Sequence, residues 1–481
     1  MRATIAASLL AAALSGEQSP AAIRGRVLAD DTGSPLPNAC VAIADGPDAV
    51  RVTTDAAGFF TLTGAHQDRQ TVSVSKSGYA KTSVELRDLM EVRLARGAVI
   101  TGHVIDDLGG PVSLMSVVAE RVTDGRVHIE RMSWAETDDT GAYRLFGLAA
   151  GDYVVGLTGT RLVGTAGTTP IPIERLVRTY YPHTDVRAEA DVVPLRAGAE
   201  VTGIDFHVDL PAPPGNRAGA PPAGARPERT GAIRGRVLRA DGLPARAARV
   251  DLSSADRLFS PFGMATDLDG RYEFTDLKPG RYIVAATDST SMTTARFGQR
   301  GPLDRGAIVT VTAGGAVEGV DVAMPRVSVI AGRVVDEYGD AIENANVRLQ
   351  RIEWSRGRRR LASVRGVASR DTDDQGRYRL FGVPPGRYLV SAAVGEPLRG
   401  RLGAVNDLPG YVRTYFPGTP SATEAQPLDI ATSDQALNIN FALSTGQTGR
   451  IAGRVFAADG HPFRGTVHLI ASARSAAIAA E

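Results

Sequence analysis

The side chains that most often carry chemistry are few in this sequence of 481 residues. A hydrolytic zinc site needs two closely spaced ligands, as in His-x-x-Glu, and a more distant histidine. None of the seven histidines has this spacing; His103 comes nearest, with Asp106 three positions later, but the pair lies where a strand runs into a turn. His-Glu-x-x-His and Gly-x-Ser-x-Gly are also missing. We therefore predict no catalytic residue, no metal ligand and no cofactor, and a protein that is not an enzyme.

Paired aspartates precede a glycine at Asp267–Gly270 and at Asp373–Gly376. They resemble the start of a calcium loop, but the further acidic ligands and the final glutamate of an EF-hand are missing. A hairpin turn accounts for them better, because an aspartate bonds its own backbone and a glycine accepts a positive φ. A weak, partial calcium site stays the alternative.

Covalent cross-links cannot hold this chain together in a general way. Cys40 is the only cysteine, so an intramolecular disulfide is impossible. An isopeptide bond needs a lysine, and the only lysines are Lys76, Lys81 and Lys278, none of them in the recurring opening strands described below. Stability must therefore come from packing.

Aromatic side chains support a binding hypothesis, because sugars can rest their apolar C–H faces on aromatic rings. Two tryptophans lie in long hairpins, and two aromatic pairs lie in matching insertions. The six candidate carbohydrate-binding residues are Trp134, Trp354, Tyr180, Tyr181, Tyr415 and Phe416. The alternative is that these side chains fill small cores beneath the insertions.

The densest basic stretch is Arg351–Arg360, in which Trp354 is interleaved with arginines. Such a stretch could stack on and neutralise an acidic polysaccharide or a nucleic acid. The alternative is a solvated hairpin in an arginine-rich chain. The net charge of +1 gives no global field to attract nucleic acid, so we predict no nucleic-acid partner.

One block of sequence recurs through the chain and organises it. An aspartate and a glycine bracket a turn, alternating apolar residues follow as a half-buried strand, and a second turn, Pro-Gly-x-Tyr in its fullest form, starts another strand. The copies begin at Asp55, Asp138, Asp267 and Asp373. An earlier apolar stretch opens each repeat around a glycine that lets a neighbouring strand approach closely, at Gly25, Gly102, Gly235, Gly332 and Gly453. These glycines are 77, 133, 97 and 121 residues apart, which indicates domain-sized modules.

Short strands about every eight to twelve residues, punctuated by Gly, Pro and Asp, indicate an all-β protein made of β-sandwiches. We expect tandem β-sandwiches, with four complete modules and a truncated fifth. The predicted boundaries are 20–96 for module one, 97–210 for module two, 231–326 for module three, 327–445 for module four and 446–481 for module five. A Pro/Gly/Ala-rich linker at 211–230 is expected to be disordered.

Residues 1–15 have the pattern of a signal peptide. Arg2 precedes about a dozen apolar residues, and Ala13-Leu14-Ser15 offers a cleavage site. A buried N-terminal helix is the alternative. No segment approaches the length of about eighteen apolar residues that a membrane span needs. We expect an exported protein, located in the periplasm, at the outer-membrane surface or outside the cell.

The repeated signatures resemble the carboxypeptidase regulatory-like domain family. The resemblance rests on the opening Gly-Arg-Val, the Asp-x-x-Gly-x-Tyr turn and the Pro-Gly-x-Tyr segment, and it runs from about Pro20 to Leu443. It implies tandem seven-stranded Greek-key sandwiches of the transthyretin-like type, in the group with carbohydrate-binding-like folds, in a multi-module secreted bacterial protein. It does not itself imply peptidase activity. The segment Leu277–Tyr282 resembles a tyrosine corner, whose buried hydroxyl bonds back to the backbone.

Three hypotheses for the function follow. The first is a non-enzymatic binding or spacer protein of the cell envelope, with a polysaccharide or envelope glycan as its ligand. The second is a purely structural scaffold whose modules hold protein partners apart. The third is an accessory region of a larger secreted peptidase or TonB-dependent receptor.

Overall fold

The computed structural model describes residues 23–446 with internal gaps, of which the longest are 44–50, 63–70, 159–176, 209–229 and 395–410, and it also describes residues 455, 456 and 461. The predicted signal peptide lies outside the described residues. So do the predicted linker, except for its last residue, and nearly all of module five. The names of modules one to four are kept below for the predicted stretches of sequence.

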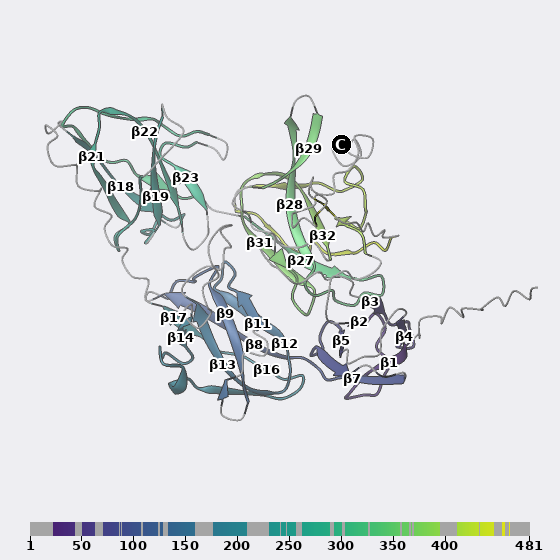
Figure 1. The fold of residues 1–481 in the computed structure, drawn as a ribbon. Coiled ribbons are helices and arrows are strands. Elements are labelled where there is room, and N and C mark those ends of the chain that lie inside the picture. Colours follow the sequence, from purple (N-terminus) through teal and green to yellow (C-terminus); the bar gives the residue numbers. More distant parts are fainter. Residues whose placement is uncertain are drawn as a thin grey trace, which may run out of the picture. The chain divides into compact units, whose positions relative to one another are not determined.

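Strands make up almost all of the regular structure (Figure 1). In the described part of the chain, the strands form eight sheets, and each of the four module stretches holds two of them. The helical content there is one short 3-10 turn, η2 (Arg187–Glu189), and no described helix is long and apolar enough to cross a membrane. The prediction of an all-β chain of sandwiches is confirmed, whereas the division into separately folding modules stays a prediction.

Contact density divides the chain into two compact units. The first consists of Met1–Lys76 and Lys81–Leu94, and the second of Ser77–Ala80 and Ala95–Glu481. The first unit contains one sheet in the order β4-β1-β7 and another in the order β3-β2-β5-β6. Its strands are β1 (Ile23–Ala29), β2 (Cys40–Ile43), β3 (Arg51–Thr53), β4 (Phe59–Leu62), β5 (Thr71–Ser75), β6 (Thr82–Glu85) and β7 (Leu89–Leu94).

The second unit contains modules two, three and four. The strands of module two are β8 (Ala98–Asp106), β9 (Ser116–Thr123), β10 (Arg126–Val127), β11 (Ser133–Glu136), β12 (Ala142–Leu148), β13 (Gly151–Thr158), β14 (Val177–Tyr180), β15 (Val192–Leu195), β16 (Glu200–Val201) and β17 (Phe206–Val208). Those of module three are β18 (Gly231–Leu238), β19 (Arg249–Ser254), β20 (Phe262–Ala265), β21 (Arg271–Leu277), β22 (Gly280–Thr287), β23 (Thr294–Arg296), β24 (Val309–Val311), β25 (Ala316–Val317) and β26 (Val322–Ala323). Those of module four are β27 (Ser328–Val335), β28 (Asn346–Ser355), β29 (Arg358–Ser363), β30 (Arg370–Asp371), β31 (Arg377–Val383), β32 (Gly386–Ala393), β33 (Thr414–Tyr415), β34 (Leu428–Ile430), β35 (Gln435–Ala436) and β36 (Phe441–Ala442).

One pairing pattern recurs in all four modules. The opening strand pairs antiparallel with the strand after the aspartate turn and parallel with the closing strand, as β27 does with β31 and β36. The second sheet is built around an antiparallel pair, such as β28 with β32. Apolar side chains from both sheets pack between them, and in module four Ile330, Leu380 and Val390 are fully buried there. The alternation of apolar and polar residues places one face of each strand in this core.

The opening glycines are required by a close backbone approach. A Cβ atom on Gly102 would lie 2.0 Å from the carbonyl oxygen of Ile204, and one on Gly332 would lie 2.1 Å from that of Ile439. The same carbonyl oxygens accept hydroxyl hydrogen bonds from buried tyrosines, with O–O distances of 2.5 Å from Tyr143 and 2.7 Å from Tyr378. The glycine, the tyrosine and the chain before the closing strand therefore form one packing unit.

The hydrogen bond of the predicted tyrosine corner is also present, although Tyr282 is only partly buried. The Tyr282 hydroxyl donates to the carbonyl oxygen of Lys278 at 2.8 Å, and the Tyr388 hydroxyl donates to that of Pro384 at 2.7 Å. In both cases the acceptor lies four residues earlier in the chain. The Pro-Gly-x-Tyr segment thus links the strand start to the preceding turn.

Candidate functional site

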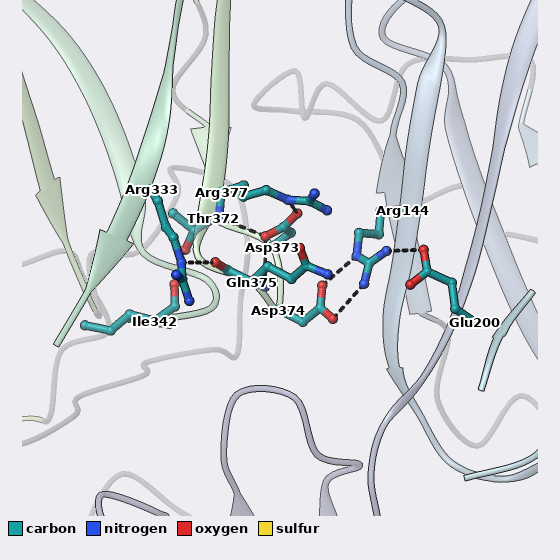
Figure 2. A network of polar contacts seen from close by, with 9 residues as sticks. All are labelled: Arg144, Glu200, Arg333, Ile342, Thr372, Asp373, Asp374, Gln375 and Arg377. Atoms are coloured by element: carbon teal, nitrogen blue, oxygen red, sulfur yellow. Dashed lines mark hydrogen bonds and ion pairs between the residues drawn. The ribbon is translucent and has the colours of Figure 1, made fainter. Parts of the chain in front are cut away.

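An ion pair connects module two to module four (Figure 2). Arg144 lies in β12 directly after the buried Tyr143, and Asp374 lies in the turn before β31. Arg144 Nε donates to Asp374 Oδ1 at 2.7 Å, and Nη2 donates to Oδ2 at 3.0 Å. The two side chains are only 13% and 11% exposed. A bidentate pair shielded from water in this way fixes orientation as well as distance between its two partners.

Glu200 completes the contacts of Arg144. Its Oε1 accepts a hydrogen bond from Arg144 Nη1 at 2.7 Å, so the guanidinium bridges two carboxylates (Figure 2). Burial lowers the pKa of Arg144, but the hydrogen bonds to Asp374 and Glu200 outweigh this effect and raise the pKa above its ordinary value. Arg144 is therefore a permanent cation at this site.

A second ion pair between the two modules has the same form. Arg379 in β31 donates through Nε to Asp139 Oδ1 at 2.5 Å and through Nη2 to Oδ2 at 2.8 Å. The hydrogen bond to Asp139 raises the pKa of Arg379. The side chains are 29% and 20% exposed, so this pair is also partly screened from water.

A third ion pair and an apolar contact lie beside these two. Arg370 in β30 donates to Glu136 in β11, and its guanidinium carbon lies 5.0 Å from the centre of the Phe381 ring. Phe381 packs with Val329 of module four and with Leu114 of module two in one buried cluster. This cluster removes apolar surface of both modules from water. We call these three ion pairs and the cluster of Leu114, Val329 and Phe381 the docking interface.

The turn that carries Asp374 is held by its own hydrogen bonds. The carboxylate of Asp373 accepts hydrogen bonds from the backbone N–H groups of Gln375 and Arg377 at 2.9 and 2.8 Å. Two further bonds brace the turn, from Arg333 Nε to the Gln375 carbonyl at 2.7 Å and from Thr372 Oγ1 to the Ile342 carbonyl at 2.5 Å (Figure 2). Asp374 is therefore presented to Arg144 by a rigid loop.

Glu343 lies next to this turn. Its Oε2 atom is buried and has no hydrogen-bond partner among the described residues. Burial, together with the negative charge of Asp374, raises the pKa of Glu343 from 4.5 to about 7, while a hydrogen bond from the backbone N–H of Gly78 opposes the rise. Ser77 Oγ also accepts a hydrogen bond from the backbone N–H of Glu343 at 3.0 Å. Ser77 lies in the segment Ser77–Ala80, which belongs to the second compact unit. Glu343 is thus a proton-binding group beside the docking interface.

The four aromatic residues of the two insertions lie against the cores. Tyr180 and Tyr415 are buried, at 5% and 8% exposure. Tyr181 packs edge-on against Phe206 with ring centres 6.4 Å apart, and Phe416 packs edge-on against Phe441 at 6.2 Å. This placement favours a packing role for the four rings, because a buried ring has little surface left to offer a sugar.

The two tryptophans lie in different hairpins of modules two and four. Trp134 in β11 is 38% exposed, and it lies opposite Val118 of the neighbouring strand β9. Trp354 pairs with Arg359 across the β28–β29 hairpin, and its side chain lies outside the described part of the structure. The basic stretch Arg351–Arg360 therefore includes a hairpin, as its solvated-hairpin interpretation expects. A sugar-binding role for either tryptophan stays a prediction.

The first aspartate of each pair stabilises its own turn by hydrogen bonds. Asp267 and Asp373 each accept two backbone hydrogen bonds within their own turn, and Asp374 accepts from Arg144. In the portion of the chain that the structure describes, no group of three or more His, Cys, Asp or Glu residues could hold a metal ion. The hairpin-turn interpretation thus accounts for these carboxylates.

The family model described as carboxypeptidase regulatory-like domain matches residues 22–94, 232–325 and 329–397. Each matched range contains an opening strand and the aspartate turn that follows. These three stretches of the chain therefore match carboxypeptidase regulatory-like domains. The matched ranges leave out module two, which nevertheless has the same pairing of opening, turn-following and closing strands. The resemblance seen in the sequence is therefore confirmed.

Several solved structures are similar to this chain at low identity. The TIE protein of Bacillus anthracis is 11% identical over 85% of this chain and 68% of that one, with a TM-score of 0.17. A streptococcal ancillary pilin is 11% identical over 74% of this chain and all of that one, with a TM-score of 0.25. A minor pilin of Streptococcus agalactiae is 13% identical over 47% of this chain and all of that one, with a TM-score of 0.23. A search of curated proteins gives no match.

The docking interface is not predicted by the sequence. In the sequence, Arg379 is only a polar position that alternates with Tyr378 and Leu380 in a half-buried strand, and nothing singles out Arg144. A signal was present, because both arginines directly follow the buried tyrosine of the repeated block. Which surface would face them could not be read from the sequence, since Asp139 and Asp374 lie more than 200 positions from their partners.

Proposed function

We propose that this protein is a non-catalytic, exported scaffold in which the docking interface holds modules two and four at a fixed mutual position. The observation that carries the proposal is the set of three inter-module ion pairs, by Arg144, Arg379 and Arg370, around one buried apolar cluster. Arrays joined only by linkers keep relative domain motion, whereas a docked pair presents its surfaces at a defined spacing. Such a protein would hold protein partners apart in the cell envelope.

The test is a distance measurement on the full chain. Spin labels on Asp152→Cys in module two and Arg387→Cys in module four, in a Cys40→Ser background, report the spacing by pulsed electron resonance. Both positions are exposed and lie outside the docking interface. We expect one narrow distance distribution, because the docked modules cannot move independently. A broad distribution, as expected for two modules connected only through module three and a linker, would contradict the proposal.

Carbohydrate binding is the second candidate function, and the exposure of Trp134 favours it. A half-exposed indole offers an apolar face on which a sugar ring can rest. The test is the retention of the full chain on soluble and insoluble polysaccharides, with Trp134→Ala and Trp354→Ala as variants and Tyr282→Ala of module three as a control. Retention that both tryptophan variants keep would contradict a sugar site at these residues.

A further inference from the structure

The two principal ion pairs of the docking interface use equivalent residues of modules two and four. Asp139 and Asp374 each directly follow the turn aspartate, and Arg144 and Arg379 each directly follow the tyrosine whose hydroxyl bonds a carbonyl near the closing strand. The register agrees, because Tyr143 pairs with Gly102 and Tyr378 pairs with Gly332. Each module therefore contributes one aspartate and one arginine from the same positions.

The atoms of the two pairs correspond as well. In both, Nε donates to Oδ1 and Nη2 donates to Oδ2, with distances of 2.7 and 3.0 Å for Arg144 and 2.5 and 2.8 Å for Arg379. An interface in which residue i contacts j and j contacts i is the mark of isologous, two-fold association. Modules two and four thus meet as the two halves of a pseudo-dimer within one chain.

Modules one and three lack this pair of residues. In module one the equivalent positions hold Ala56 and Thr61, which carry no charge. In module three they hold Leu268 and Glu273, and Glu273 accepts a hydrogen bond from Arg234 of its own module at 2.6 Å. An arginine presented by module two would meet Leu268 rather than a carboxylate there, and Glu273 would face an aspartate. Charge complementarity therefore excludes module three as a partner.

The apolar part of the docking interface does not follow the two-fold symmetry of the ion pairs, and it favours the pairing of module two with module four. Leu114 packs on Val329 and Phe381, and it has a positive φ of 62°. The equivalent residue of module four is Asn344, with a φ of 58°. Asparagine tolerates this left-handed conformation, whereas a branched, apolar side chain is uncommon in it. A pairing of module four with another module four would put Asn344 where Leu114 packs.

We propose that three positions select the partner of module two. The first two are the aspartate after the turn aspartate and the arginine after the buried tyrosine, which both modules have. The third holds apolar Leu114 in module two and Asn344 in module four. The occupant of the module-two surface is module four of the same chain. This inference rests on the proposed scaffold function and names the residues that specify its geometry. The two reciprocal ion pairs are the specificity determinants, and Leu114 sets which of the two modules contributes the apolar side chain.

Charge reversal and exchange in the full chain test this proposal, with the spin labels described above. Arg144→Asp places an acid opposite Asp374 and beside Glu200, and we expect the narrow distance peak to be lost. Arg144→Asp combined with Asp374→Arg re-forms the pair with its charges exchanged, and we expect the narrow peak to return. Arg379→Asp with Asp139→Arg should behave in the same way. The matched control is Arg234→Asp in module three, which removes ion pairs with Glu273 and Glu318 and should leave the peak unchanged.

The outcomes separate this inference from the proposed function. A broad distribution in the unsubstituted chain would contradict the scaffold itself. A narrow distribution that survives Arg144→Asp, or that the charge exchange does not restore, would overturn the selection by these positions and leave the scaffold standing. Sedimentation of the same samples adds a further check, because dimers formed in place of the intramolecular pair would show that a second copy is the preferred occupant. Circular dichroism confirms that each variant is folded.

Discussion

Modules two and three share one fold but differ in a polar residue that the fold does not determine. Both have the glycine-centred opening strand, the aspartate turn and the buried tyrosine that bonds a backbone carbonyl. On the strand face opposite that tyrosine, module two places Arg144, which reaches Asp374 of module four. Module three places Glu273 there, and this residue is satisfied within its own module by Arg234. The core motif therefore specifies the sandwich, and the polar residue next to it decides whether the sandwich docks.

The largest effects should come from the opening glycines, which both kinds of module need. Gly332→Ala and Gly235→Ala each place a Cβ atom about 2 Å from a backbone carbonyl, at Ile439 and Val320. We expect each to destabilise its module by about 4 kcal/mol or more, because backbone must move. Thermal unfolding measures the loss.

The same two variants separate folding from docking. Gly332→Ala should also remove the narrow distance peak between modules two and four, since module four no longer folds normally. Gly235→Ala should leave that peak in place. Loss of the peak with Gly235→Ala would show that module three takes part in holding the pair together.

The next effect concerns the ion pairs. Arg379→Ala leaves the partly buried carboxylate of Asp139 without its arginine, and we expect it to weaken docking by about 2 to 4 kcal/mol. Arg234→Ala in module three removes an exposed network and should have no measurable effect on docking. Equal effects of the two variants on the distance distribution would contradict the contrast between the modules.

The proton on Glu343 should make the second unit sensitive to pH. Folding raises the pKa of this group from 4.5 to about 7. Between pH 4.5 and 7 the folded protein therefore holds a proton that the unfolded chain has already released. Stability is therefore full below about pH 4.5, falls as pH rises towards 7 and is then constant, with a total change of roughly 3 kcal/mol.

Glu343→Gln is the control for this pH dependence. The amide cannot ionise, so the free energy of unfolding of the variant should lose the part of its slope between pH 4.5 and 7 that is due to this group. Denaturant titrations of both proteins over that range provide the comparison. A difference between the two proteins that is the same at all pH values would show that folding does not raise the pKa of Glu343.

The smallest effect separates local strain from docking at Leu114. Leu114→Asn relieves a left-handed leucine, so module two itself should gain about 1 kcal/mol of stability. Docking should weaken at the same time, because the side chain that packs on Val329 and Phe381 is lost. Hydrogen exchange in β9 and β12 measures the stability of module two, and the distance distribution measures docking. A variant that keeps the narrow peak would show that Leu114 is not a docking residue.

Much of the fold could be predicted from the sequence. The opening glycines, the aspartate turns and the Pro-Gly-x-Tyr segments are local patterns, and each reports a local requirement: a close approach, a turn, or a tyrosine that bonds back four residues. The site could not be predicted in the same way. Arg144 and Asp374 are ordinary polar residues in their own neighbourhoods, and only their meeting gives them a role. The aromatic candidates illustrate the same limit, since the sequence left open whether Tyr180 and Tyr415 are buried or exposed.

The sequence by itself determined the all-β architecture, the recurring sandwich and the residues that hold each one together, because these depend on contacts that the repeated block always makes with its own module. Only the tertiary structure decided that the arginine after the tyrosine in module two meets the aspartate of module four, and that Leu114 lies in the apolar contact between them. The physical reason is that a half-buried strand hides one face in its own core and leaves the other undetermined. What covers that second face depends on a surface encoded more than 200 residues away.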